Sequence, residues 1–312
     1  MHGRHRVSHP SPYARGHPLN GFTTRFAPAP TGYLHLGHAV NAVWVWGLAR
    51  AFGGRVLLRV EDHDRGRCRK EYELALLDDL DWLGLMPDEP TTSAFRDEGH
   101  RIPLRQSDNT ERYVTRLGEL ERAGRAFVCT CPRSERYPGT CRYRRLDPAV
   151  TPARRVIIES GHPEQFIDMR LGEQTQDPDL QCGDVPVRDR TGNWTYHFAV
   201  VVDDFEQGVD MVIRGEDLLD STGRQLRLAR MIGRGTPPRF LHHPLVRKAD
   251  GQKLSKSSRD TGLRDLRDAG HSPQEVLGIA AHYGGLQASP LPVDVGTLPD
   301  LLGAWARQRA LF

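Results

Sequence analysis

The sequence of 312 residues predicts an α/β fold in which helices connect the strands of a parallel sheet. Near the N-terminus, residues 22–27 and 55–60 are strand-like runs, and the apolar residues between them follow helical spacing. Further along, strand-like residues 209–214 and 240–246 flank a helix expected at 225–232. Strands joined by a helical crossover are parallel, and the connection is right-handed. We therefore expect a Rossmann-like sheet with its ligand site at the carboxyl edge of the strands.

The first loop of this sheet has the residues of an anion site. Residues 28–38 are rich in Pro and Gly and end in His35-Leu-Gly-His38. The helix expected at 39–52 presents unpaired N–H groups at its N-terminus, and these favour an anion. Gly37 lets a backbone approach closely, and the two histidine rings can donate N–H groups to phosphate oxygens. Two histidines three positions apart also occur on ordinary surfaces and at metal sites, so the pair alone does not decide.

The remaining elements define the expected organisation. Further helices are predicted near 71–83 and 110–123, a strand-like run at 193–203, and a capped helix start at Ser272-Pro-Gln-Glu275. The expected segments are a disordered leader at 1–21, the first half of the nucleotide-binding domain at 22–124, an insertion at 125–190, the second half at 191–245, and a loop with a helical appendage at 246–312.

Lysine is concentrated in one loop. Only four of the 43 Lys and Arg residues are lysine, and Lys248, Lys253 and Lys256 lie within nine residues. Two of them belong to Gly251-Gln-Lys-Leu-Ser-Lys-Ser-Ser258. A flexible ammonium group follows a phosphate as a mobile point charge better than a planar guanidinium does. The loop predicts a polyphosphate site, although a solvated basic loop is the alternative for this feature taken alone.

Together, the histidine and lysine motifs resemble the paired motifs of class I aminoacyl-tRNA synthetases. Four segments extend the resemblance to the glutamyl branch, and they are Arg25-Phe-Ala-Pro-Ala-Pro-Thr-Gly-Tyr-Leu-His-Leu-Gly-His38, Arg59-Val-Glu-Asp-His-Asp-Arg65, Tyr196-His-Phe-Ala-Val-Val-Val-Asp-Asp204 and Ile213-Arg-Gly-Glu-Asp217. The resemblance covers residues 22–258 in the right order. It implies a ligase with a Rossmann-like catalytic domain, a zinc-bearing insertion that binds the acceptor end, and a small helical C-terminal appendage.

The length of the chain favours one branch of this family. Only 54 residues follow Ser258 in the 312-residue chain, which leaves no room for a large anticodon-reading region. This resembles glutamyl-Q tRNA(Asp) synthetases. The resemblance implies ATP-dependent activation of L-glutamate to glutamyl-adenylate without tRNA, with Mg²⁺ accompanying ATP, and transfer of glutamate to queuosine at the wobble position of tRNA(Asp). The alternatives are the catalytic core of a conventional glutamyl-tRNA synthetase, a small-molecule nucleotidyltransferase, and a non-catalytic tRNA-binding protein descended from a synthetase.

The resemblance also implies roles for single residues. Arg25 and Arg214 would hold substrate carboxylates, Glu61 the α-ammonium group, and Tyr196 would hydrogen-bond the amino acid. The full set is Arg25, Ala27, Ala29, Glu61, Tyr196 and Arg214 for glutamate, His35, Gly37, His38, Lys253 and Lys256 for ATP, and His35, His38, Lys253 and Lys256 for catalysis. Outside these motifs, the arginines and Glu61 would be interpreted as structural ion pairs.

Two positions depart from the pattern of the family. Ala29 stands where many relatives have serine, so one polar contact to the substrate is missing. Val200 stands where full-length glutamyl enzymes usually have asparagine, which fits the truncated branch. Neither change removes a charge, and we expect activation to survive both.

Three of the five cysteines lie close together in the sequence. Cys129, Cys131 and Cys141 fall within 13 residues, and the odd total argues against a disulfide framework. Three thiolates are an incomplete tetrahedral zinc set, and no histidine lies between Cys129 and Arg145 to complete it. The segment resembles the zinc site of the family, in which the oxygen of Tyr137 would be the fourth ligand.

Two other oxygen ligands also fit the sequence. Water or Tyr143 could replace Tyr137, because a phenol must lose or strongly share its proton to bind a metal. Cys68 and Cys182 are expected to be plain thiols.

Composition agrees with an enzyme without identifying one. The net charge of +3 does not by itself imply nucleic acid, so tRNA contacts would come from arginine clusters at 142–145 or 224–234, which are equally compatible with solvated surface. No run of about 20 apolar residues exists, and residues 1–20 lack the apolar region of a secretory signal. We expect a cytoplasmic monomer.

Overall fold

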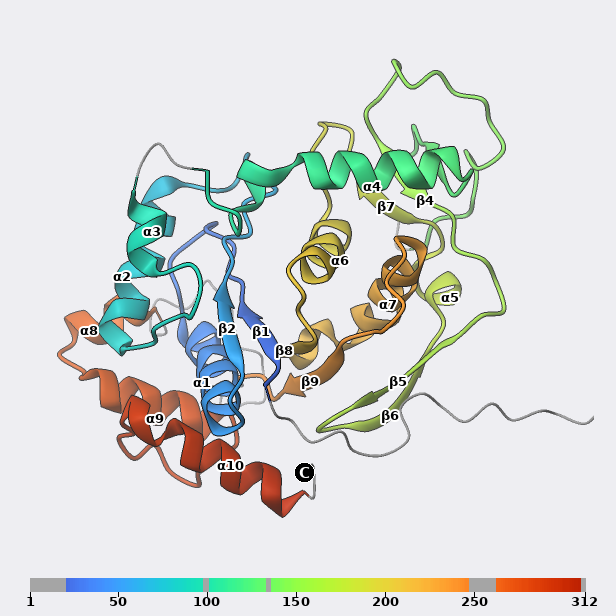
Figure 1. Ribbon diagram of the computed structural model, residues 1–312. Helices are drawn as coiled ribbons and strands as arrows, with labels where there is room; N and C mark the ends of the chain where they lie inside the picture. The colour runs from blue at the N-terminus through green and yellow to red at the C-terminus, as the bar shows by residue number, and fades with distance from the viewer. Residues whose placement is uncertain (1–20, 98–100, 133–135, 247–261, 310–312) are drawn as a thin grey trace, which may run out of the picture.

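The first structural unit follows the predicted strand, loop, helix and strand. The computed structural model describes residues 21–97, 101–132, 136–246 and 262–309. Strand β1 (Thr23–Phe26) pairs in parallel with β2 (Arg55–Leu58), and α1 (Leu36–Ala51) is the crossover between them (Figure 1). The predicted parallel pairing is confirmed. The predicted leader lies outside the described residues except for Gly21.

Further helices follow along the described residues. Those of the described residues, after α1, are α2 (Lys70–Leu83), α3 (Thr92–Arg96), α4 (Glu111–Arg122), α5 (Pro178–Cys182), α6 (Tyr196–Glu206), α7 (Thr222–Met231), α8 (Leu263–Asp268), α9 (Pro273–Tyr283) and α10 (Leu298–Gln308), with short 3-10 turns at Gln106–Asn109, Glu216–Ser221 and Val295–Thr297. The helices predicted near 71–83, 110–123 and 225–232 are confirmed. The predicted capped start of α9 is also confirmed, because Ser272 and Glu275 form a reciprocal capping box.

A second sheet combines two parts of the chain that the sequence places in different segments. Its order is β6–β5–β9–β8, with β8 (Met211–Gly215) parallel to β9 (Arg239–His243). The antiparallel hairpin of β5 (Glu164–Asp168) and β6 (Gly172–Gln176) joins through a parallel contact between Asp168 and Phe240. This hairpin lies inside the range predicted for the insertion, yet it pairs with the catalytic half. The mixed polar sequence of the hairpin did not indicate that it belongs to this four-stranded sheet.

The two halves meet at the first strand of each. The backbone N–H of Asp210, next to β8, donates to the carbonyl of Thr23 at 3.1 Å, and the N–H of Thr23 donates to the Asp210 carboxylate at 2.8 Å. The guanidinium of Arg25 on β1 also donates to the carbonyl of Ile213 on β8. The carboxyl ends of β1 and β8 therefore lie close together.

The rest of the predicted insertion forms a small antiparallel sheet at the far end of α4 (Figure 1). Its order is β3 (Ala126–Val128), β4 (Arg154–Val156) and β7 (Val185–Arg188). The cysteine cluster follows directly after β3, and Cys129 donates its backbone N–H to the carbonyl of Ala153. The sheet thus anchors the segment that holds the cysteines.

The strand-like run predicted at 193–203 is wrong. All but the first three of these residues belong to α6, whose buried residues include Phe198 and Val200 to Val202. A run of β-branched residues favours a strand by propensity, but a helix that is buried on several sides has the same continuous apolar pattern. Tertiary packing between α4, α7 and β7 decides for the helix.

Helix α1 is the centre of the main core. It packs against α9 and α10 on the side away from β1 and β2, and its Trp44 is fully buried against Trp305 of α10 (Figure 1). The close approach of α10 depends on Gly47, because a Cβ atom there would lie 2.5 Å from Leu302. None of the described helices combines the length and the apolar character that crossing a bilayer requires.

Replacing Gly47 by alanine tests this packing. The added methyl group must displace the Leu302 side chain of α10, so we expect a loss of about 1–3 kcal/mol in the free energy of unfolding measured with urea. The control is Gly118→Ala on α4, where nothing lies within 4 Å of the new Cβ atom. That change should stabilise the protein by about 0.5–1 kcal/mol. Equal effects of the two substitutions would contradict the proposed contact.

Candidate functional site

One cavity brings together residues predicted for glutamate and residues predicted for ATP. It has a volume of about 590 Å³ and lies where the carboxyl ends of β1 and β8 face the start of α1. Its lining includes Arg25, Ala27, His35, Gly37, His38, Glu61, Tyr196 and Arg214. A second cavity, of about 420 Å³, is lined by none of the predicted site residues that the structure describes.

The histidine motif caps the first helix. His35 is the N-cap of α1, and its Nδ1 accepts the backbone N–H of Gly37 at 3.1 Å. In return, Nδ1 of His38 accepts the N–H of His35 at 3.1 Å. Because each Nδ1 acts as an acceptor, a neutral ring at either position has its proton on Nε2. The helix therefore starts three residues before its predicted start. The prediction missed this start because histidine is not among the usual capping residues.

Gly37 is required by this cap. A Cβ atom at this position would lie 2.9 Å from the ring of His35. Any larger residue would therefore displace the imidazole that caps the helix.

A buried ion-pair network lies at the inner end of the cavity. The Asp204 carboxylate accepts from Arg25 at 3.1 Å and from Arg59 at 2.8 Å. Arg59 also donates to Glu61 at 3.1 Å and to Gln207 at 2.9 Å. Arg25 and Glu61 are predicted site residues. Arg59 and Asp204 belong to the motifs at 59–65 and 196–204, but the sequence assigned them no role. Only their position in those motifs could have indicated that they take part in the ion-pair network.

The environment shifts the acid–base properties of this network. Burial raises the pKa of Glu61, and Arg59 only partly opposes this effect. Burial alone would also raise the pKa of Asp204, but its two arginine partners outweigh burial and hold that pKa below its usual value. Burial and the nearby Glu61 raise the pKa of the Tyr196 phenol. Asp204 is therefore the ionised centre of the network, and Tyr196 remains a neutral hydrogen-bonding group.

Arg214 differs from Arg25 in its partners. Its guanidinium donates to Nε2 of His242 at 3.0 Å, to Oε1 of Gln225 at 2.5 Å and to the hydroxyl of Thr222 at 2.9 Å. All three acceptors are uncharged when the imidazole is neutral. The sequence pattern gave no signal for these three partners, because they lie on α7 and β9, which only the fold brings next to Arg214 on β8.

The remaining predicted residues have different positions. Ala27 lines the cavity, whereas Ala29 is exposed and is not among the lining residues. Val200 is buried in α6, in a core cluster separate from the cavity. The predicted roles of the two alanines stay predictions.

Lys253 and Lys256 lie outside the described residues, as does Lys248. The described residues on either side of them are close to the histidine motif. Val246 lines the cavity, Gly262 forms a bridge with His35, and the N–H of Leu263 donates to the carbonyl of Leu34 at 3.0 Å.

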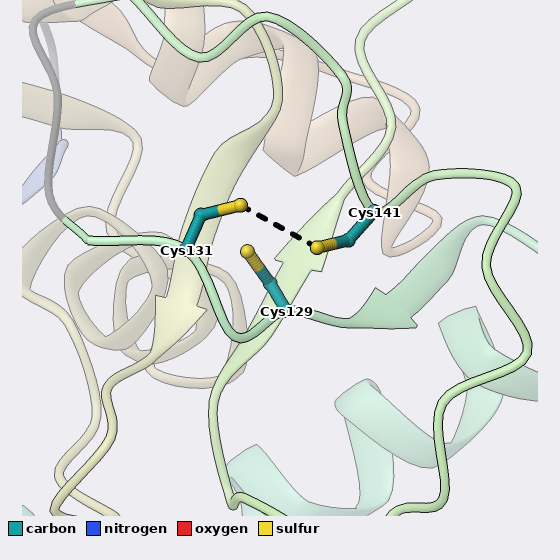
Figure 2. Close-up of side chains that lie close together, drawn as sticks. All are labelled: Cys129, Cys131 and Cys141. Carbon is teal, nitrogen blue, oxygen red and sulfur yellow. Dashed lines mark hydrogen bonds between the residues drawn. The ribbon is translucent and has the colours of Figure 1, made fainter.

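The predicted cysteines converge in space. The Sγ atoms of Cys129, Cys131 and Cys141 all lie within 4.8 Å of one another, and those of Cys131 and Cys141 are 3.4 Å apart (Figure 2). Figure 2 shows the thiol groups pointing toward a common centre from two segments of the insertion. This geometry fits a metal that takes sulfur ligands, since thiolates around one zinc ion approach each other to similar distances.

Tyr137 is well placed beside these thiols. Its hydroxyl oxygen lies 3.6 Å from Sγ of Cys129 and 3.8 Å from Sγ of Cys131, and it accepts the N–H of Cys141 at 2.7 Å. The side chain of Tyr143, the alternative ligand, is 89% exposed. The structure therefore favours Tyr137 over Tyr143 as the oxygen nearest to the cluster.

A positive charge accompanies the cluster. The Arg155 guanidinium donates to Sγ of Cys129 at 3.3 Å and lies over the Tyr137 ring at 4.0 Å. Burial would raise the pKa of the Cys141 thiol, but hydrogen bonds from the Thr130 backbone and from neighbouring side chains lower it to about 6. The environment thus stabilises the Cys141 thiolate, the form that binds a metal, whereas burial raises the pKa of Cys131 and of the Tyr137 phenol.

Comparison with known proteins identifies the family. The protein family described as "tRNA synthetases class I (E and Q), catalytic domain" matches residues 22–138 and 152–285, which is most of the chain. The chain belongs to the class I tRNA synthetases. The prediction of a ligase with this catalytic fold is thereby confirmed.

Curated relatives of this synthetase support the predicted branch. A glutamyl-Q tRNA(Asp) synthetase of Symbiobacterium thermophilum is 39% identical over 86% of this chain and 88% of its own length. The protein of the same name from Cupriavidus metallidurans is 41% identical over 84% of each chain. A glutamate–tRNA ligase 2 of Halorhodospira halophila is 35% identical, and the synthetase spans 56% of its length.

Solved structures agree on the fold. The crystal structure of the glutamate-tRNA synthetase from Elizabethkingia anophelis superimposes with a TM-score of 0.71 at 24% identity. The match covers 84% of this synthetase and 61% of that chain.

The Asp204 network predicts a large cost for removing its central carboxylate. Asp204→Ala would leave Arg25 and Arg59 buried with only Glu61 between them, so we expect a loss of about 3–5 kcal/mol in urea unfolding. In the control Glu89→Ala, the lost pair with Arg55 is more than half exposed on both sides, and the loss should stay below about 1 kcal/mol. Similar losses in the two variants would show that the Asp204 network contributes little.

Proposed function

We propose that the synthetase activates L-glutamate with ATP in the absence of tRNA and transfers it to queuosine at the wobble position of tRNA(Asp). The observation that supports this most directly is Arg214, a buried cation with uncharged partners, in the same cavity as the N-terminus of α1. Such a cation is suited to a carboxylate ligand, and a helix N-terminus to a phosphate. The cavity can therefore hold the two groups that must react.

In the first step, an oxygen of the glutamate α-carboxylate attacks the α-phosphorus of ATP. A bond forms between that oxygen and phosphorus, the bond from phosphorus to the bridging oxygen breaks, and pyrophosphate leaves with the bonding electrons. This reaction needs positioning and charge neutralisation rather than a protein nucleophile. We assign these tasks to His35, His38 and the backbone at Gly37, together with Lys253, Lys256 and Mg²⁺ bound with ATP.

The glutamate would lie at the inner end of the cavity. Arg214 and Arg25 would hold its two carboxylates, Glu61 its α-ammonium group, and the neutral phenol of Tyr196 would donate a hydrogen bond. Arg25 already shares Asp204 with Arg59, so its charge is partly balanced within the protein. Arg214 is therefore the stronger anchor in this proposal.

We also propose one structural zinc ion in the insertion. Cys129, Cys131 and Cys141 would supply three sulfur ligands and Tyr137 the oxygen, with Arg155 balancing part of the negative charge. The ion would fix the loop that follows β3 at the distal sheet. The insertion would then present a rigid surface to tRNA.

The relatives favour queuosine-containing tRNA(Asp) as the acceptor. Relatives named glutamyl-Q tRNA(Asp) synthetase match this chain over 84–96% of their length at 38–41% identity, and this supports queuosine-containing tRNA(Asp). The second candidate is the catalytic core of a conventional glutamyl-tRNA synthetase, which the 35% identity to the ligase of Halorhodospira halophila favours. The family match leaves the small-molecule nucleotidyltransferase without support.

Exchange of pyrophosphate into ATP distinguishes these functions. We expect glutamate-dependent exchange without tRNA, followed by charging of tRNA(Asp) that contains queuosine but not of the same tRNA with unmodified guanine. Charging of tRNA(Glu), or exchange that requires tRNA, would favour the conventional core. Lys256→Ala should lower the exchange rate about 100-fold or more with little change in KM for glutamate, since it would act on the phosphates in the transition state. A proportional rise in KM for glutamate would contradict that role.

Zinc binding is tested independently of activity. We expect one zinc ion per chain by metal analysis, and Co²⁺ substitution should give thiolate charge-transfer absorption. Cys141→Ser should abolish tight binding in a competition with a chelator, whereas Cys68→Ser, outside the cluster, should not. Tyr137→Phe should weaken binding about 10-fold or more if the phenol is a ligand. Unchanged affinity in that variant would leave water as the fourth ligand.

A further inference from the structure

Arg214 is held by a chain of side chains that no motif in the sequence indicates. Its Nε–H donates to Nε2 of His242 at 3.0 Å, and Nδ1 of His242 donates to the Asp168 carboxylate at 2.7 Å. His242 and Asp168 are both fully buried. The three residues lie on β8, β9 and β5, which are successive strands of the four-stranded sheet. This series of hydrogen-bonded side chains therefore runs across the sheet, from Arg214 at the cavity to the buried Asp168.

The hydrogen bonds define the state of the imidazole. A guanidinium N–H can only donate, so Nε2 of His242 must be the acceptor. The proton of the neutral ring is then on Nδ1, where the Asp168 carboxylate accepts it. Burial lowers the pKa of His242, and the positive charge of Arg214 acts in the same direction against the pull of Asp168. A protonated ring would oppose an N–H group to Arg214 and break this hydrogen bond.

Asp168 is itself fixed on both oxygens. Oδ1 accepts the backbone N–H groups of Arg170 at 3.0 Å and Leu171 at 2.9 Å. Oδ2 accepts the backbone N–H of His242 at 3.0 Å in addition to the ring N–H. A carboxylate with this set of donors has no rotational freedom, and it can transmit its orientation to the imidazole.

The imidazole also separates two charges that would otherwise cancel. A carboxylate in direct contact with Arg214 would neutralise it, as Asp204 partly does for Arg25, and would compete with an anionic ligand. With His242 between them, Asp168 orients Arg214 at a distance. Gln225 and Thr222 complete the orientation with uncharged oxygen atoms.

We propose that Asp168 and His242 are positioning residues that hold Arg214 in place for the carboxylate of the amino-acid substrate. This inference rests on the proposed role of Arg214 in glutamate binding. Neither residue touches the substrate, so their effect passes entirely through the guanidinium. Removing them should weaken glutamate binding and leave ATP binding unchanged.

Asp168→Asn is the most direct variant. Both oxygens of Asp168 accept N–H groups, so the amide NH₂ must face a donor at one of the two positions. Opposite His242, the amide forces the ring proton onto Nε2, where it meets Arg214. In the exchange assay we expect KM for glutamate to rise about tenfold or more and KM for ATP to change less than twofold.

A second pair of variants protects the test against misfolding. His242→Phe keeps a planar ring beside Phe240 but removes the acceptor, and it should raise KM for glutamate as Asp168→Asn does. His242→Gln keeps one donor and one acceptor and should recover part of the loss. A purely structural role would order these variants by stability instead, as measured by thermal unfolding.

Two controls separate the possible outcomes. Asp184→Asn changes another fully buried carboxylate that accepts a backbone N–H and a guanidinium in the insertion, and it should lower stability without changing KM for glutamate. Arg214→Ala tests the proposed function itself. If Arg214→Ala leaves KM for glutamate unchanged, both proposals fail. If it raises KM but Asp168→Asn and His242→Phe do not, or if they act only as Asp184→Asn does, the positioning role alone is overturned.

Discussion

The shared carboxylate of Asp204 is the interaction on which the site depends. It joins Arg25 on β1 to Arg59 just after β2, and its own helix, α6, belongs to the second half of the chain. Asp204 follows Arg59 by 145 positions and Arg25 by 179 positions, so these charges pair only when the two halves are docked. Because unpaired buried charges are costly, the network favours the docked arrangement over alternatives in which the halves meet differently.

The docked arrangement gives Arg25 and Arg214, the two arginines of the cavity, different kinds of partner. Arg25 is tied to a carboxylate and contributes to the junction, whereas Arg214 is tied to an imidazole, an amide and a hydroxyl. The same side-chain type is thus paired with a carboxylate in one place and with uncharged groups in the other. The difference arises from the neighbours that the fold supplies and not from the motif that contains each arginine.

The sequence predicted those features that depend on local pattern. The β1–α1–β2 unit follows from apolar spacing and glycine boundaries, and the clustering of three cysteines follows from their spacing. The pattern failed at α6, where β-branched residues occupy a buried helix, and at the β5–β6 hairpin, whose partner strand is some 70 residues away. The pair Asp168 and His242 could not be predicted for the same reason, since its contact depends on long-range sheet pairing.

The central claim is that one cavity, between the start of α1 and Arg214, receives both substrates. It is tested by calorimetric binding of a non-hydrolysable glutamyl-adenylate analogue in competition with each substrate. We expect a single site per chain, from which ATP and glutamate each displace the analogue. Displacement by only one of the two, or two independent sites, would contradict it.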